Sequence, residues 1–504
     1  MSYAALEAHH RKLSHLRHTE AIVAWDEAAL MPAGGGEARA EALATLRGVI
    51  HECATDARLG EWFAAAEAKA GELGPWQAAN LREMRREWTR SNAIPQDLVE
   101  AASRAETKSE QAWRSLRANN DWNGFLPYLR EVVGLKRRVA EALSATLGLG
   151  MYDALLDGYE PGARSAAFAP LFQRLRAFLP DFIQSVLERQ RSERVIAPVG
   201  PFAVERQKWL GLELMKCVGF DFEHGRLDTS HHPFCGGVPQ DVRITTRYDA
   251  ADFAKSLMGV LHETGHAKYE QNLPRDWMTQ PVGSARGMSV HESQSLLLEM
   301  QVCRSRAFLS FAAQLIAKAF PDALVREPAA FTADNLFKLQ TRVKPSYIRV
   351  DADEATYPCH VVLRFEIEKP LIEGSLKVED IPAAWDAGMR ELLGLSTENN
   401  YRDGCMQDVH WPAGLFGYFP TYTLGALTAA QLYRAARNAI PDLAAVIEAG
   451  DFAPLDGWLR ENVWGQGSLL DTNTLLERAT GKVLDTRAFE DHLRERYLDI
   501  APAG

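Results

Sequence analysis

The chain has 504 residues, of which 46% are apolar, so it can bury a large core, and its length would allow roughly two to four domains. A formal net charge of −11 argues against nucleic acid or an anionic membrane as the main binding partner. The six cysteines form no Cys-x-x-Cys pair, which favours reduced thiols in a cytoplasmic protein over a disulfide framework. Residues 1–7 lack a basic start followed by an apolar run, so we expect no secretory signal.

Most of the first 190 residues carry the periodicity of amphipathic helices with charged outer faces, as in residues 81–88 and 126–133. These segments predict an antiparallel helical array, and no Ser/Gly/Pro-rich linker divides the chain. We therefore expect a mainly α-helical fold that forms one domain over residues 1–504. The longest uncharged run, residues 411–433, is interrupted by Pro and Gly, so we interpret it as a buried loop and a core helix, not a membrane span.

The pattern changes between residues 226 and 248. Residues 231–237 are typical of a turn, and residues 241–248 alternate and are rich in β-branched side chains, which predicts a short strand or hairpin. An edge strand here could hydrogen-bond the backbone of an extended peptide. A hairpin with only a structural role explains the same pattern equally well.

The next predicted helix contains the sequence His262-Glu263-x-x-His266. Histidines four residues apart project from one face of a helix, where both can reach one metal ion at about 2.0–2.1 Å. Glu263 lies at the edge of that face, where it can accept a proton from a water molecule on the ion. Two histidines that match this pattern by chance are the alternative, so the neighbouring sequence must decide.

This helix is expected to begin near Asp249, which together with Asp252 offers an N-cap and an acidic first turn. It should end before Pro274. Gly265 in its interior costs about 1 kcal/mol relative to Ala, which indicates that another element approaches closely there.

A catalytic zinc ion needs a third protein ligand and an open position. Glu270 cannot supply it, because it lies two turns from His262 on the same helix, a rise of about 12 Å. A second predicted helix contains residues 289–299, beyond a loop long enough for a return. We predict Glu292, on this helix, as the third ligand. Glu299, two turns later on much the same face, is either a competitor for the ion or a partner of one of its ligands.

The order of these motifs resembles that of the Taq-type (thermostable carboxypeptidase 1-like) metallocarboxypeptidases, cytoplasmic enzymes that remove single residues from peptide C-termini. Six motifs in register carry the resemblance. They are His232-Pro233-Phe234, Asp241-x-Arg243-x-Thr245, His262-Glu263-x-x-His266, His291-Glu292-Ser293-Gln294-Ser295, Ile348-Arg349-x-x-Ala352-Asp353 and Gly404-x-x-Gln407-Asp408-x-His410-Trp411. The resemblance implies a two-lobed helical metallopeptidase fold with a long central groove, a homodimer, and a divalent ion that is zinc or sometimes cobalt.

Carried over residue by residue, the resemblance makes His262, His266 and Glu292 the metal ligands. It makes Glu263 the general base. It also makes Arg349 the anchor for the terminal carboxylate of a substrate, and His410 a contact near the scissile peptide.

The role of Arg349 suits a guanidinium, which offers paired donors in a fixed geometry to a carboxylate. The competing interpretation is a salt bridge from Arg349 to Asp351, Asp353 or another acid. Arg243 and Arg247 are weaker candidates for the same anchor.

The uncharged, glycine-rich run holds Tyr418 and Tyr422, and His410 directly precedes it. A neutral imidazole or a phenol there could donate a hydrogen bond to the oxyanion that forms as water attacks. We rank His410 first and Tyr422 second, and expect Tyr418 to contact the substrate. Either tyrosine is also explained as a buried aromatic whose hydroxyl bonds a carbonyl. We expect His232 and Asp241 to shape the groove.

Together with these residues, the resemblance implies a carboxypeptidase of broad specificity that uses a metal-activated water, with peptides as substrates and its active-site motifs within residues 226–425. Two departures from the family pattern, Leu296-Leu297-Leu298 and Pro358-Cys359, concern substrate preference. The nearest alternative is an oligoendopeptidase or a dipeptidase on the same scaffold. A more remote one is an inactive peptide-binding protein, which the intact ligand and base residues disfavour.

Overall fold

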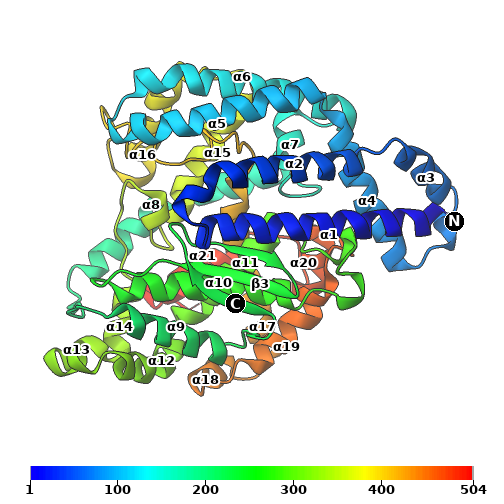
Figure 1. Ribbon diagram of the computed structural model, residues 1–504. Helices are drawn as coiled ribbons and strands as arrows, with labels where there is room; N and C mark the ends of the chain where they lie inside the picture. Colours follow the sequence, from blue (N-terminus) through cyan, green and yellow to red (C-terminus); the bar gives the residue numbers. More distant parts are fainter. Residues whose placement is uncertain (1, 502–504) are drawn as a thin grey trace.

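The computed structural model describes residues 2–501, and most of them are helical (Figure 1). Residues 81–88 and 126–133 lie in two of the helices, as their periodicity predicted. The helices of this first part are α1 (Ser2–Ala29), α2 (Gly36–Ala54), α3 (Arg58–Glu67), α4 (Pro75–Ala93), α5 (Gln96–Ala118), α6 (Trp122–Leu147), α7 (Met151–Leu156) and α8 (Ser165–Gln190).

The remainder of the chain is also mainly helical, so the predicted fold class is confirmed. Its helices are α9 (Val204–Cys217), α10 (Phe253–Gln271), α11 (Met288–Leu296), α12 (Arg306–Ala319), α13 (Pro321–Arg326), α14 (Ala333–Gln340), α15 (Tyr357–Glu373), α16 (Ile381–Leu393), α17 (Pro420–Ala439), α18 (Leu443–Glu448), α19 (Ala453–Asn462), α20 (Thr472–Thr480) and α21 (Arg487–Leu498). A π-helical segment, η5 (Leu297–Cys303), directly continues α11. The uncharged run is a loop followed by α17, and among residues 2–501 we find no helix with the length and apolar character of a membrane span.

Two large clusters of buried apolar side chains form the interior. The first involves α5 to α8, α15, α16 and α21, and includes Phe172 and Phe365; α5, α6, α15 and α16 lie in the upper part of Figure 1. The second involves α9, α10, α12, α14 and α19, and includes Phe308. Helix α17 contributes Leu427 to the first cluster and Leu432 to the second. One helix therefore joins the two cores.

A small sheet precedes α10. Its central strand is β3 (Asp241–Thr246), which pairs parallel to β1 (Gly225–Thr229) and antiparallel to β2 (Cys235–Val238). The predicted hairpin is therefore present as β2 and β3. Residues 241–246 form the central strand of this sheet, with β1 on one side and β2 on the other, so its edge strands are β1 and β2. Val242 and Ile244 of β3 are buried in a small cluster shared with α10.

Helix α10 is capped by Asp252, whose side chain accepts hydrogen bonds from two backbone N–H groups of the first turn. The start predicted near Asp249 is too early, because Asp249 accepts a backbone hydrogen bond in the preceding turn instead. The helix ends at Gln271, before Pro274, as predicted.

Helices α10 and α11 approach each other closely at Gly265. A Cβ atom at this position would lie 2.5 Å from the carbonyl oxygen of Gln294 and 2.6 Å from the Cα atom of Ser295. Both are backbone atoms, which cannot rotate aside. The close approach predicted from Gly265 is confirmed, and it brings the residues of α11 within reach of the histidines of α10.

Gly265→Ala is expected to lower the free energy of unfolding by about 1–3 kcal/mol, because the backbone of α11 must move to make room. Gly259→Ala is the matched control on the same helix, since no atom lies within 4 Å of its added Cβ. That control should stabilise the protein by up to about 1 kcal/mol through helix propensity. Chemical denaturation of both variants measures the difference, and equal changes would contradict the role of Gly265.

Candidate active site

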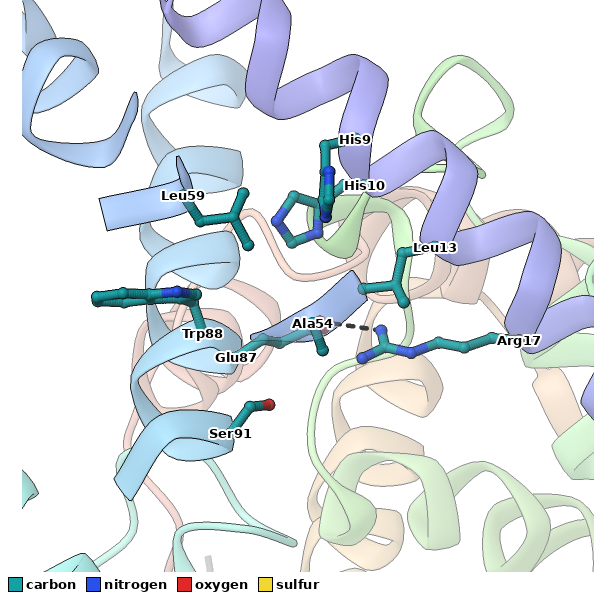
Figure 2. Close-up of a pocket in the computed structure, with 9 residues that line it drawn as sticks. All are labelled: His9, His10, Leu13, Arg17, Ala54, Leu59, Glu87, Trp88 and Ser91. Carbon is teal, nitrogen blue, oxygen red and sulfur yellow. Dashed lines mark hydrogen bonds and ion pairs between the residues drawn. The ribbon is translucent and has the colours of Figure 1, made fainter. Parts of the chain in front are cut away.

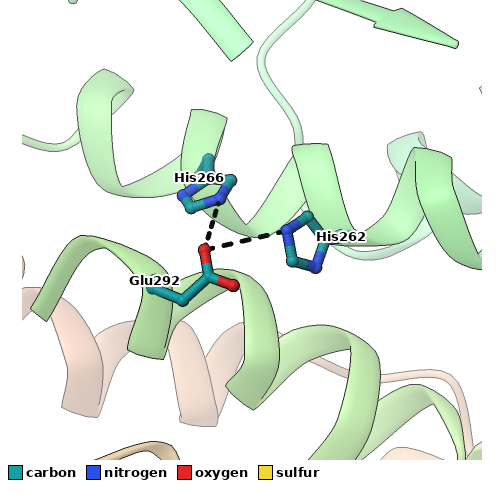
Figure 3. Close-up of side chains that lie close together, drawn as sticks. All are labelled: His262, His266 and Glu292. Atoms are coloured by element: carbon teal, nitrogen blue, oxygen red, sulfur yellow. Dashed lines mark ion pairs between the residues drawn. The ribbon is translucent and has the colours of Figure 1, made fainter. Parts of the chain in front are cut away.

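Three side chains of the types that bind metal ions meet between α10 and α11 (Figure 3). His262 and His266 lie one turn apart on α10, and Glu292 lies on α11. The Oε2 atom of Glu292 is 3.2 Å from Nε2 of His266 and 3.9 Å from Nε2 of His262. Atoms that could act as ligands all lie within 4.8 Å of one another. Ligands of a tetrahedral zinc ion are roughly 3.3 Å apart, given bonds of about 2.0–2.1 Å, so the set has the right size for such an ion.

The outer ring nitrogens of both histidines are already engaged. Nδ1 of His262 is 2.9 Å from Oε2 of Glu299, and Nδ1 of His266 is 2.6 Å from Nδ1 of His291. The Nε2 atoms, which face Glu292, are therefore those left to bind an ion, and such partners on the far nitrogen are usual for histidine ligands. Glu299 therefore contacts the candidate ligand His262, which is one of the two roles predicted for it.

The acidic side chains around the histidines attract positive charge. Burial opposes a charge on His262, but Glu292 and Glu299 raise its pKa to about 10. Burial lowers the pKa of His266 to about 4 despite its hydrogen bond to Glu292, so this imidazole is neutral, as a metal ligand must be. A divalent cation would interact with the same carboxylates that hold a proton on His262. The donor set and its charge both fit a metal ion.

Glu263 lies beside the histidines on α10 and is only 8% exposed. Burial raises the pKa of its carboxyl group to about 7; the charge of His262 opposes this shift, while Glu292 and Glu299 add to it. A carboxyl group that titrates near neutral pH can both take up and release a proton during turnover. These properties suit the base role that the sequence predicted for Glu263.

A second group of predicted residues lies in the loop before α17 and in its first turn. Nε2 of His410 is 3.1 Å from the hydroxyl of Tyr422. The ring of Tyr418 lies 5.3 Å from that of Tyr422 and 5.6 Å from the imidazole of His410. Burial lowers the pKa of His410 to about 3, so its imidazole is neutral at pH 7, and burial raises the pKa of Tyr418 to about 12. The three side chains thus form a cluster of neutral hydrogen-bonding groups, called here the His410 cluster.

Helix α17 places this cluster beside the three candidate ligands. Gly425 packs so closely on Glu292 that an added Cβ would lie 2.9 Å from the Cβ atom of Glu292. Tyr422 lies three residues before Gly425, on the same side of the helix. The charge of Glu292 also contributes to the raised pKa of both Tyr418 and Tyr422, although burial is the larger cause.

Arg349 is buried and already paired. Its Nε and Nη2 atoms donate to Asp408 at 3.2 and 2.9 Å, and its Nη1 atom donates to the hydroxyl of Tyr357. The salt bridge that the sequence offered as an alternative is therefore present. Its acid is Asp408, within the motif that also holds His410, whereas the nearby Asp351 and Asp353 have other partners.

A second arginine shares the same acid. Arg364 on α15 is fully buried, and its Nε atom donates to Asp408 at 2.7 Å. Two guanidinium groups and one carboxylate leave a net charge of +1 in a buried place. The guanidinium carbon of Arg349 lies 5.0 Å from the centre of the Tyr422 ring, so this charge borders the His410 cluster. A buried excess charge is costly unless an anion pairs with it, and the terminal carboxylate of a peptide is such an anion.

The other predicted residues lie at the sheet. Asp241 and Arg243 form an ion pair with a distance of 2.8 Å, and the guanidinium carbon of Arg243 lies 4.3 Å from the ring centre of Trp25 on α1. His232 is exposed in the loop before β2, and Arg247 is exposed after β3. The charge of Arg243 is therefore engaged by its neighbour and by the N-terminal helix, which weakens it further as a candidate anchor.

Several partners of the candidate site were not predicted from the sequence. Glu270 was excluded as a ligand, yet its Oε1 atom is 2.8 Å from Nε2 of His291, which in turn contacts His266. No local signal predicts this chain of contacts, because it depends on how α10 packs on α11. A signal was present for Arg364, since an arginine flanked by apolar residues in the sequence 361–365 needs a buried acid as its partner.

Comparison with known proteins gives a consistent result over nearly the whole chain. The family model described as Carboxypeptidase Taq (M32) metallopeptidase matches residues 5–497. Thermostable carboxypeptidase 1 of Thermus thermophilus is 39% identical over 513 residues, which cover 99% of each chain. Carboxypeptidase 1 of Bacillus subtilis is 32% identical over 97% of each chain.

Solved structures agree with the fold. Metallocarboxypeptidase 1 of Trypanosoma cruzi has a TM-score of 0.96 at 42% identity, covering 98% of this chain and 99% of the other. An M32 carboxypeptidase of Deinococcus radiodurans has a TM-score of 0.93 at 35% identity, covering 99% of both chains. Family match, sequence identity and fold together show that the chain belongs to the carboxypeptidase Taq (M32) family of metallopeptidases.

Proposed function

We propose that the protein hydrolyses single amino acids from the C-termini of peptides, with broad specificity, in one peptidase domain that spans residues 1–504 and carries its active-site motifs within 226–425. The observation that carries this proposal is an arrangement of three features. They are the candidate metal ligands, the buried carboxyl group of Glu263 beside them, and the buried excess positive charge of Arg349 and its partners beside Tyr422. The first two features serve peptide hydrolysis, and the third serves recognition of a terminal carboxylate.

The proposed metal ligands are His262, His266 and Glu292, and the proposed ion is zinc, with cobalt as an alternative. Two imidazoles and one carboxylate are a usual ligand set for a catalytic zinc ion that keeps a position open. The chemistry that such an ion supplies when bound is polarisation of the peptide carbonyl and acidification of water to a pKa of about 7. The protein holds the ligands on two helices whose separation is set at Gly265.

Glu263 is the proposed general base. Its carboxylate accepts a proton from the attacking water and then returns it to the leaving amine, so the reaction needs no covalent acyl-enzyme. A residue that performs both transfers needs a pKa near the working pH, and burial raises the pKa of Glu263 to about 7.

His410 and Tyr422 are proposed to stabilise the oxyanion as one donor pair. They share a hydrogen bond of 3.1 Å. If the imidazole N–H donates to the phenol oxygen, the hydroxyl proton of Tyr422 is free to donate to the substrate. Loss of one oxyanion donor typically costs about 10²–10³ in rate. Tyr418 is proposed as a substrate contact because its ring lines the same cluster.

Arg349 is the proposed anchor for the substrate carboxylate. The shared carboxylate of Asp408 fixes its guanidinium and leaves one positive charge without a partner acid. His232, Asp241 and Arg243 remain predictions as residues of the substrate groove. A homodimer and a cytoplasmic location likewise remain predictions from the family resemblance; light scattering on the purified protein tests the first.

A digest followed by mass spectrometry tests the proposed activity. We expect a peptide with a free C-terminus to yield a ladder that shortens one residue at a time, and the same peptide with an amidated C-terminus to resist. Removal of the ion with a chelator should abolish the ladder, and Zn²⁺ or Co²⁺ should restore it. Cleavage at internal bonds, at equal rates on both peptides, would instead support an oligoendopeptidase.

A further inference from the structure

Three side chains form a continuous hydrogen-bonded chain behind one of the candidate ligands. Nδ1 of His266 is 2.6 Å from Nδ1 of His291, and Nε2 of His291 is 2.8 Å from Oε1 of Glu270. His266 and Glu270 lie one turn apart on α10, and His291 reaches between them from α11. All three side chains are largely buried, with between 12% and 24% exposed.

The protons of this chain can be assigned from the donors and acceptors. If the lone pair of Nε2 on His266 binds an ion, the proton of that ring lies on Nδ1 and is donated to His291. Nδ1 of His291 must then accept, so its own proton lies on Nε2 and is donated to Glu270. The carboxylate of Glu270 needs no further proton to end the chain. This one arrangement satisfies every atom, with both imidazoles neutral.

The rings are also held in place by packing. The imidazoles of His266 and His291 lie 4.7 Å apart at 36°, and the ring of Tyr269 lies 5.5 Å from His291. The close approach at Gly265 brings α11 near enough for the short contact between the two imidazoles. His291 thus has a fixed position between a candidate ligand and an acid.

The other histidine ligand is supported differently. Nδ1 of His262 contacts the carboxylate of Glu299 directly at 2.9 Å, and Glu299 is held by Arg304 at 2.7 Å. His262 therefore has a carboxylate on its outer nitrogen, whereas His266 has a neutral imidazole that passes the interaction on to a carboxylate. Both histidines are thus connected to a carboxylate, His262 directly to Glu299 and His266 through His291 to Glu270.

We propose that His291 and Glu270 act as positioning residues that fix the tautomer and orientation of His266 and thereby tighten metal binding. The inference rests on the proposed metal site. Its chemical basis is that a hydrogen-bond acceptor on the far nitrogen of a histidine raises the basicity of the nitrogen that binds the ion. His291 and Glu270, called here the relay, thus give His266 an interaction with a carboxylate through His291. Glu299 gives His262 the same interaction directly.

Zinc affinity of the full-length protein tests the relay, measured by competition for Zn²⁺ with a chromophoric chelator. His291→Phe keeps a flat ring but removes both hydrogen bonds, so the dissociation constant should rise about 10- to 100-fold. Glu270→Gln keeps an acceptor oxygen but removes its charge, so the rise should be smaller. His291→Gln offers one amide oxygen and one N–H group, so it should recover part of the affinity lost in His291→Phe.

His10→Phe is the matched control for loss of a buried histidine. His10 lines a small cavity between α1 and α4 (Figure 2), and its variant should bind Zn²⁺ as the wild type does. Thermal unfolding of the metal-free variants separates affinity from stability. Wild-type affinity in His291→Phe, or an equal loss in His10→Phe, would overturn the proposal. If His291→Phe does not fold, wild-type affinity in Glu270→Gln would overturn it.

A further variant separates failure of the relay from failure of the site. His266→Ala removes the ligand itself, so it should lose far more zinc affinity than any relay variant. If His266→Ala binds Zn²⁺ as tightly as the wild type, the proposed metal site is wrong and the relay falls with it. If His266→Ala loses affinity while the relay variants do not, only the relay is wrong.

Discussion

Glu263→Gln should retain zinc but lower kcat by about 10²–10⁴-fold, the usual contribution of a general acid–base group. The amide has nearly the shape of the carboxyl group but cannot accept the proton of the attacking water. Glu263 is not among the atoms that meet as candidate ligands, so the ion should stay bound. Metal analysis of the purified variant, together with single-residue release from one peptide, measures both effects.

Glu292→Gln is the matched variant, because it makes the same chemical change at a proposed ligand. It removes the negative charge that lies 3.2 Å from His266 and 3.9 Å from His262, so zinc content and activity should fall together. The pair therefore separates a base from a ligand. Full turnover in Glu263→Gln, or loss of zinc in that variant, would contradict the proposed role of Glu263.

Local periodicity was enough to predict that His262 and His266 lie on one face of a helix at the candidate site. The four-residue spacing of His262 and His266 requires only that the segment is helical, and the structure places both on α10. The rise of a helix excluded Glu270 as a ligand and required a return helix, which led to Glu292. Each of these predictions depends only on distances within one element or between two neighbouring elements. The spacing of residues in the sequence is enough to estimate such distances.

Properties that depend on distant pairing could not be predicted in the same way. Alternation predicted a strand at residues 241–248, but it does not reveal that β1 pairs with the outer side of β3. Likewise, Asp351 and Asp353 were natural partners for Arg349 by sequence distance, whereas the actual partner is Asp408, 59 residues away. Sheet order and buried ion pairs are set by the packing of whole elements, which a single sequence does not show.

The buried pairing of Arg349 changes what its anchor role requires. A guanidinium whose donors are taken by Asp408 and Tyr357 has less to offer a new anion than a free one. However, Asp408 also neutralises Arg364, so one positive charge remains for two arginines and one acid. A terminal carboxylate that arrives at this group would bring the local charge to zero. The proposed anchor is therefore the three-residue group of Arg349, Arg364 and Asp408, not Arg349 alone.

Arg349→Ala should lower kcat/KM for peptides with a free C-terminus by about 30-fold or more, because truncating one partner of a buried charge pair costs about 2–5 kcal/mol. The variant leaves Asp408 and Arg364 as a neutral pair, so no acid is left unpaired. The same peptide with an amidated C-terminus carries no charge for Arg349 to bind, so its slow hydrolysis should change little. Arg243→Ala, which removes an arginine paired with Asp241, is the matched control and should affect both peptides alike. An equal loss on both peptides in Arg349→Ala would remove Arg349 from the anchor role.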